Sequence, residues 1–211
     1  MKVDAYKTEE EQVQAIKQWW KENSLSIIAG IVIGGAILGG YSYFGEYKQS
    51  QAQQASVIYS SILATKEDKT KDVEILKNDY SSTPYAALAS LILAKDAVDK
   101  SEIEKAASEL KWVVDNAADD GVQHIAKQRL ARLYLNQNNI DAAESLIQSI
   151  KSQEFSAIYS EIRGDINLAK NLPVQAKENY RLALSAMTSA DQRYRIIKMK
   201  LDDLTQAKVT K

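Results

Sequence analysis

Residues able to perform acid–base or nucleophilic chemistry are few in this 211-residue sequence, and no catalytic constellation is formed by their spacing. His124 is the only histidine and cysteine is absent, which excludes histidine pairs, thiolate metal sites and disulfides. A serine hydrolase would need His124 together with a GxSxG-like turn, and the sequence has no such turn. We therefore expect no catalytic residue, no metal and no cofactor, and we interpret His124 as an ordinary surface or interface residue.

Two close carboxylate pairs remain as candidates for acid–base work, Glu102 with Glu104 and Asp119 with Asp120. Both pairs lie where helices are predicted to begin. Negative charge at a helix start is favoured by the macrodipole, so we interpret these carboxylates as helix-start charges and not as a catalytic pair.

The most distinctive element is a run of 21 residues, Leu25–Gly45, without a charged side chain. At about 1.5 Å per helical residue this run spans roughly 31 Å, the thickness of a bilayer hydrocarbon core. Aromatic residues flank it at both ends, as is typical at the headgroup level: Trp19, Trp20, Tyr41, Tyr43, Phe44 and Tyr47. The run predicts a single transmembrane helix; its length and the acidic flank before it disfavour a cleaved signal peptide.

The orientation of this helix rests on a small excess of basic residues. Lys7, Lys17 and Lys21 precede the run, whereas only Lys48 follows it before Lys66. The positive-inside rule then places the N-terminus in the cytoplasm and the C-terminal domain on the far side of the membrane.

Small residues recur four positions apart within the run, as Gly30 with Gly34, Gly35 with Gly39, and Ala36 with Gly40. Such a stripe lets another helix backbone approach closely, so the four glycines Gly30, Gly34, Gly35 and Gly39 are candidate helix-packing positions. The alternative is that glycine is simply frequent in membrane helices. A second copy of the chain and a larger membrane protein are both open as partners.

The rest of the chain is electrically neutral and is predicted to be helical. Of the 27 basic and 28 acidic residues, four and five precede Gly45, which leaves equal numbers behind it. Nucleic acid and anionic lipid headgroups both require a basic surplus, so neither is expected as the main partner. Two prolines, Pro84 and Pro173, and no glycine between Gly45 and Gly121 predict an all-α domain.

Helix boundaries are marked by several local signals. Thr83-Pro84 is typical of an N-cap followed by the first helical position, and Pro173 fits the first turn of another helix. Ser101 with Glu104 has capping-box spacing, and Asp120 with Gln123 is a weaker version. A last helix over 192–204 is expected to cap the domain with one apolar face: Tyr194, Ile197, Leu201 and Leu204.

A pattern of small residues repeats three times, with units offset by 37 and then 33 positions. In each unit a small residue precedes an alanine by 12 positions: Ala94 and Ala106, Ala131 and Ala143, Gly164 and Ala176. This resembles the tetratricopeptide repeat, a helix pair of about 34 residues, and predicts a helical-repeat superhelix. The repeats are degenerate, and an irregular bundle whose alanines reflect helix propensity is the alternative.

A superhelix of this kind presents a concave surface built by the first helix of each pair. The register assigns nine residues to that surface: Leu91, Lys95, Val98, Gln128, Arg132, Leu135, Glu161, Asp165 and Leu168. The mixture of apolar and charged groups suits a peptide or protein segment. The alternative is that Lys95, Arg132 and Asp165 are solvated charges without a partner.

Five segments carry a family resemblance that covers nearly the full length: Glu10–Asn23, Tyr85–Lys95, Leu130–Leu133, Ile162–Asp165 and Met199–Leu204. Together with the glycine-rich span, they resemble the ancillary (YfgM-like) subunit of the bacterial SecYEG translocon. The resemblance implies a Gram-negative inner-membrane protein with a periplasmic domain. It also implies two partners, the translocon and a membrane-anchored periplasmic chaperone of the PpiD type, and a role in passing translocated chains to chaperones.

The sequence thus divides into a cytoplasmic segment (1–24), a transmembrane helix (25–45), membrane-proximal helices (46–82) and a tetratricopeptide-like domain (83–211). We expect a non-catalytic adaptor anchored in the bilayer. Two alternatives remain open: a self-associating structural scaffold of the cell envelope, and a holdase that binds unfolded chains directly.

Overall fold

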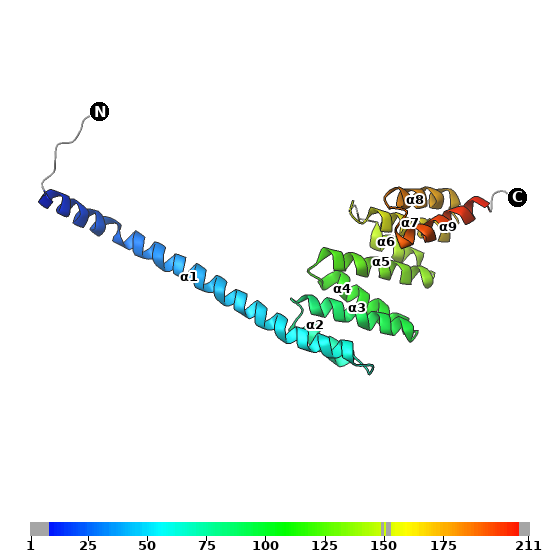
Figure 1. Ribbon diagram of the computed structural model, residues 1–211, viewed down its shortest axis with the longest axis horizontal. Helices are drawn as coiled ribbons and strands as arrows, with labels where there is room; N and C mark the ends of the chain where they lie inside the picture. Colours follow the sequence, from blue (N-terminus) through cyan, green and yellow to red (C-terminus); the bar gives the residue numbers. More distant parts are fainter. Residues whose placement is uncertain (1–8, 149, 151–152, 207–211) are drawn as a thin grey trace, which may run out of the picture. The chain divides into compact units, whose positions relative to one another are not determined.

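The computed structural model describes residues 9–148, 150 and 153–206, and the regular structure in these ranges is α-helical (Figure 1). The all-α class is therefore confirmed. The helices are α1 (Glu9–Ala64), α2 (Thr70–Asp79), α3 (Pro84–Asp99), α4 (Ile103–Asn116), α5 (Asp120–Asn136), α6 (Ile140–Ile147), α7 (Ser156–Ala169), α8 (Pro173–Ser185) and α9 (Gln192–Gln206).

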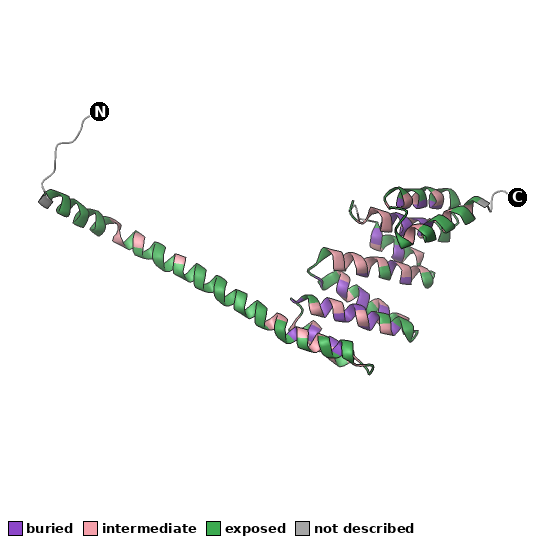
Figure 2. Ribbon diagram, in the orientation of Figure 1, coloured by how far each residue is buried: buried purple, intermediate pink, exposed green. Residues whose placement is uncertain are grey.

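The chain forms two compact units, Met1–Gln51 and Ala52–Lys211. The described part of the first unit belongs to α1, which continues without a break through the uncharged run. By length and composition, α1 is the helix in the described ranges that could cross a membrane, and its best 18-residue window has a mean hydropathy of 1.8 and no buried residue. Its side chains are mostly exposed along this stretch, as a lipid-facing helix requires (Figure 2).

The second unit begins with the end of α1. Ala55 and Ile62 of α1 are buried with Val73 and Leu76 of α2, and this cluster packs against α3. Residues of the predicted membrane-proximal segment (46–82) thus belong to a hydrophobic cluster shared with α3. The predicted segment boundaries at 24, 45 and 82 stay predictions.

Three helix pairs follow, α3 with α4, α5 with α6, and α7 with α8, and each pair turns through the same backbone geometry. Ser101, Asn138 and Asn171 are the non-glycine residues with positive φ in the described chain, at 61°, 58° and 59°. They are separated by the same 37 and 33 positions as the sequence repeats. The repeated units of the sequence are thus repeated structural units.

Hydrogen bonds at these turns identify them as Schellman motifs. The N–H groups of Glu102, Asn139 and Leu172 donate to the carbonyl oxygens of Ala97, Tyr134 and Asn167, each at 2.8 Å. A residue in the left-handed conformation is required one position earlier, and asparagine tolerates it better than most residues. This geometry closes the first helix of each pair and starts the second within three residues.

Two predicted helix starts differ in the structure. Ser101 does not cap α4, because it adopts the left-handed conformation and the N-cap position is Glu102. Asp120 is the first residue of α5, and the cap is Asp119, whose carboxylate accepts from the Val122 N–H at 2.8 Å. The other signals are confirmed, since Pro84 and Pro173 occupy the first turns of α3 and α8 and α9 begins at the predicted Gln192.

Small residues hold each pair together. The paired positions Ala94 and Ala106, Ala131 and Ala143, and Gly164 and Ala176 are all buried. Behind each pair lies one larger side chain of the second helix, which is Leu110, Ile147 and Tyr180 in turn. In the third pair the larger side chain is aromatic, and the residue opposite it is glycine instead of alanine.

Gly164 is required by the Tyr180 ring. A Cβ atom built on Gly164 would lie 2.5 Å from the Tyr180 Cδ1 atom, a distance that real Cβ atoms essentially never show, and 3.0 Å from Cζ. The ring is fully buried, and its hydroxyl donates to Asp165 at 2.7 Å, so it has little freedom to move away.

We expect Gly164→Ala to lower the stability of the second unit by about 1–3 kcal/mol, because the added methyl group overpacks the α7–α8 contact. Thermal denaturation of the full chain followed by circular dichroism measures this loss. The double variant Gly164→Ala, Tyr180→Leu recreates the Ala94–Leu110 combination of the first pair, so the two losses should be clearly less than additive. Full additivity would contradict a direct contact.

Candidate partner-binding site

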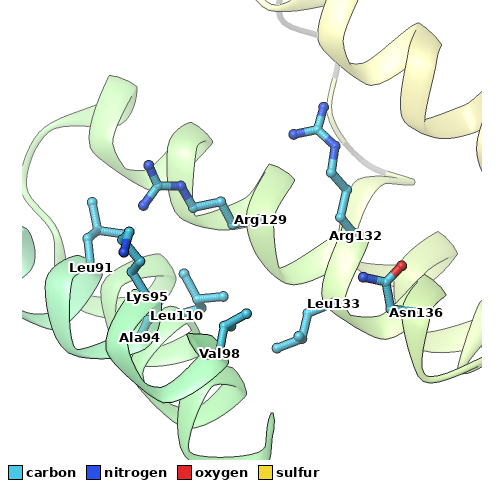
Figure 3. Close-up of a pocket in the computed structure, with 9 residues that line it drawn as sticks. All are labelled: Leu91, Ala94, Lys95, Val98, Leu110, Arg129, Arg132, Leu133 and Asn136. Carbon is cyan, nitrogen blue, oxygen red and sulfur yellow. The ribbon is translucent and has the colours of Figure 1, made fainter. Parts of the chain in front are cut away.

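The predicted concave residues line two adjoining pockets. The first has a volume of about 350 Å³ and contains Leu91, Lys95 and Val98 of α3 with Arg132 of α5 (Figure 3). Its remaining lining residues are Ala94, Leu110, Arg129, Leu133 and Asn136. Aliphatic side chains form the floor between α3, α4 and α5, while Lys95 comes from α3 and Arg129 and Arg132 come from α5 (Figure 3).

The second pocket has a volume of about 380 Å³ and contains Leu135 of α5 with Glu161 and Asp165 of α7. It shares Arg132 and Asn136 with the first pocket, and we call the two together the groove. Seven of the nine predicted residues line it. The other two are Gln128, which accepts a hydrogen bond from Arg132 at 3.2 Å, and Leu168, which is exposed on α7.

Helix α9 closes the second pocket with residues that sequence reasoning did not assign to the site: Arg193, Ile196 and Lys200. The sequence predicts the apolar face of α9, of which Ile197 is fully buried. The signal that could have found the other face is the seven-residue spacing of Arg193 and Lys200, which places both cations on one side of the helix.

Glu161 is the centre of an ion-pair network beneath this pocket. Only 1% of the residue is exposed, and its carboxylate accepts from Arg193 at 2.6 Å, from Lys200 at 3.1 Å and from Arg132 at 3.3 Å. Lys200 also donates to Asp165 at 2.7 Å. Of the residues predicted to meet a partner, Glu161 and Asp165 are therefore already occupied by the chain's own α9.

The pKa values in the network follow from burial and from these contacts. Burial raises the pKa of Glu161, but the hydrogen bonds and charges of Arg193 and Lys200 outweigh it, so the pKa lies below its ordinary value. Burial lowers the pKa of Arg132, and the nearby Arg193 acts in the same direction. Burial and the hydrogen bond to Asp165 raise the pKa of Tyr180. Glu161 is accordingly ionised at neutral pH.

His124 takes part in packing between α5 and α7. Its Nδ1 atom lies 2.6 Å from the Tyr159 hydroxyl, and its ring is 4.1 Å from that of Phe155 between centroids. Burial lowers the pKa of His124, with Lys127 acting in the same direction, and burial raises the pKa of Tyr159 to about 12. Within the described ranges, no group of three potential metal ligands is formed by histidine and carboxylate side chains.

The four predicted packing glycines all lie in α1. A Cβ atom added to Gly30, Gly34, Gly35 or Gly39 would meet no atom within 4 Å. These positions therefore have open space beside them, and a Cβ atom there meets no other part of the chain.

Comparison with known proteins agrees with this architecture. Residues 17–206 match the family described as the tetratricopeptide repeat-like domain. An ancillary SecYEG translocon subunit from Escherichia coli is 31% identical over 80% of this chain and 83% of its own length. The chain belongs to the ancillary SecYEG translocon subunit family. Members from Haemophilus influenzae and Aggregatibacter actinomycetemcomitans are 30% and 31% identical over 95% of the chain and the whole of their own lengths.

No solved structure gives a significant match to the chain. The family membership confirms the resemblance found in the sequence.

We expect Glu161→Gln to destabilise the second unit by about 2 kcal/mol at neutral pH, because three cations lose their shared carboxylate. Since the folded-state pKa is depressed, the stabilisation by Glu161 is present above its ordinary value of 4.5 and is lost as the pH falls through the folded-state pKa. The difference between the two proteins in chemical denaturation should therefore shrink below about pH 4.5.

The matched control is Glu178→Gln, which removes an exposed carboxylate 3.8 Å from Arg181. Exposed pairs of this kind contribute little, so its stability should match that of the unaltered chain. Equal losses for the two variants, or a difference independent of pH, would contradict the network.

Proposed function

We propose that this chain is a membrane-anchored, non-catalytic adaptor that associates with a SecYEG-type translocon and helps transfer translocated proteins to periplasmic chaperones. The observation that carries the proposal is the match to ancillary SecYEG translocon subunits along their whole lengths, apolar helix included. An adaptor of this kind needs a tether and a binding surface, and α1 and the groove are suited to these roles.

The proposed topology is a single pass through the bacterial inner membrane, with the N-terminus in the cytoplasm and the second unit in the periplasm. It is supported by the excess of lysine before the span. The absence of cysteine is compatible with an oxidising compartment.

The proposed periplasmic partner is a membrane-anchored chaperone of the PpiD type, and the groove is its proposed contact site. Leu91, Lys95, Gln128, Arg132, Leu135, Glu161 and Asp165 remain the candidate contact residues. Because Glu161 and Asp165 are held by α9, we assign them a positioning role and assign direct contact to Lys95 and Arg132.

A self-associating scaffold is a second candidate, favoured by the glycine stripe of α1. In that function Gly30, Gly34, Gly35 and Gly39 would contact the same residues of another copy. Direct holdase activity is a third candidate, and it predicts suppressed aggregation of a model substrate.

We expect a photocrosslinking residue at Lys95 or Arg129 to form adducts with a translocon subunit or the chaperone in intact cells, because both side chains are exposed at the groove. The same residue at Lys198, which is exposed on α9 outside the groove, is the control. Co-purification in mild detergent should recover the translocon. Recovery of neither partner by either method would reject the adaptor proposal.

We expect Gly34→Leu with Gly35→Leu to leave the mass of the purified protein in detergent unchanged, because an adaptor needs only the anchor. Light scattering after gel filtration measures this mass, and Ile37→Leu is the control for a change of side chain in the same span. A fall from an oligomer to a monomer would instead support the scaffold.

A further inference from the structure

The groove is positively charged although the chain beyond the apolar run is neutral. Five cationic side chains line its two pockets, Lys95, Arg129, Arg132, Arg193 and Lys200, against the two carboxylates Glu161 and Asp165. Its lining therefore has an excess of three positive charges. Local accumulation of one charge sign in a concave surface attracts ligands of the opposite sign.

The excess is not spread evenly along the groove. Arg193 and Lys200 form ion pairs with Glu161 and Asp165 in the second pocket. The first pocket contains Lys95, Arg129 and Arg132 and no acidic lining residue. The charge available to a ligand is therefore concentrated between α3 and α5.

These three cations differ in how far they are satisfied. Among the described residues, no carboxylate lies within ion-pair distance of Arg129, which is exposed. Lys95 pairs with Asp99 at 2.7 Å, but both side chains are more than half exposed, and such pairs are readily exchanged. Arg132 contacts Glu161 at 3.3 Å, and Arg193 and Lys200 bind the same carboxylate at the shorter distances of 2.6 and 3.1 Å.

Between the cations the floor is aliphatic: Leu91, Ala94, Val98, Leu110 and Leu133. Val98 is 43% exposed there, and a volume of about 350 Å³ is in the range of ligand pockets. Lys95 lies on the α3 wall, whereas Arg129 and Arg132 lie one helical turn apart on the α5 wall (Figure 3). Both walls are thus cationic around an apolar centre.

We propose that the first pocket binds an internal, extended segment of a partner protein in which acidic side chains flank an aliphatic one. The aliphatic side chain occupies the floor, and the carboxylates pair with Lys95 on one wall and with Arg129 and Arg132 on the other. Cations on both walls match carboxylates on both sides of the apolar residue better than they match one terminal carboxylate. The inference deepens the adaptor function and rests on it for the biological partner.

Helix α9 limits the site to this pocket. Its basic residues Arg193 and Lys200 donate hydrogen bonds to the acidic side chains of α7. The carboxylates of the second pocket are therefore already neutralised by the same chain. A ligand in the first pocket would lie beside Arg132, which connects the two pockets.

The test is a fluorescence-anisotropy titration of the full chain in nanodiscs, with empty nanodiscs as the blank. The probe is a labelled peptide, acetylated and amidated at its ends, that carries two Glu-Leu-Glu triplets separated by Gly-Ser. We expect saturable binding that weakens as salt is raised, because the charge pairs are solvent-accessible. Replacement of glutamate by glutamine, or of leucine by serine, should weaken binding roughly tenfold or more.

Two variants test the pocket, each with a matched control on another surface. Arg129→Gln should weaken binding roughly three- to tenfold. Val98→Glu should weaken it more strongly, since the introduced carboxylate on the floor repels the carboxylates of the peptide. The controls are Arg195→Gln on α9 and Val174→Glu on α8, both exposed and outside the groove, and they should bind as the unaltered chain does. Circular dichroism checks that all four remain folded.

Several outcomes would overturn the proposal. If the glutamine peptide bound as tightly as the glutamate peptide, charge would have no role in binding. If Arg129→Gln and Val98→Glu bound the peptide as the unaltered chain does, the first pocket would not be the binding site. A requirement for a free C-terminus would assign the site to a terminal carboxylate. Peptide-independent dimerisation that Val98→Glu abolishes would assign it to a second copy. Because the titration uses the purified chain, its failure is distinguishable from a failure to recover the translocon.

Discussion

The close approach of two helices across a pair of small residues is the constraint on which the second unit depends. Ala94 with Ala106, Ala131 with Ala143, and Gly164 with Ala176 are buried in successive pairs, and at Gly164 even a Cβ atom would clash with the Tyr180 ring. The Schellman turns at Ser101, Asn138 and Asn171 hold each pair in the same relation. Repetition of one pair geometry is what produces a continuous inner surface.

That surface becomes a groove because the first helices of successive pairs place their charged and aliphatic residues on the same side. Helix α9 then divides it: Arg193 and Lys200 neutralise Glu161 and Asp165, while Lys95 and Arg129 stay accessible. The part of the chain beyond the apolar run is neutral as a whole, yet it has a local positive charge in the first pocket. The tether requires a long apolar helix, α1, and the groove requires small-residue packing in the repeats. Because these requirements are separate, both can be predicted from the same sequence.

Much of the fold could be predicted because its signals are local. The uncharged run, the alanine spacing and the two prolines each act within a few turns of helix, and α1, α3, α8 and α9 follow from them. The left-handed conformation of Ser101 could not be predicted, because the spacing of Ser101 to Glu104 suggests a capping box and does not show how the preceding helix ends. Seven of nine predicted surface residues line the groove, since repeat register fixes which side of a helix faces inward.

By itself, the sequence determined an apolar helix and three helix pairs, because periodicity and residue type act over short distances. Only the tertiary structure decided which predicted contact residues stay available. Glu161 meets Arg193 and Lys200 from 32 and 39 positions away, and no local pattern encodes that meeting. Arg129 lines the groove for the same reason: its position depends on how α5 packs against α3 and α4, which is a property of the assembled stack.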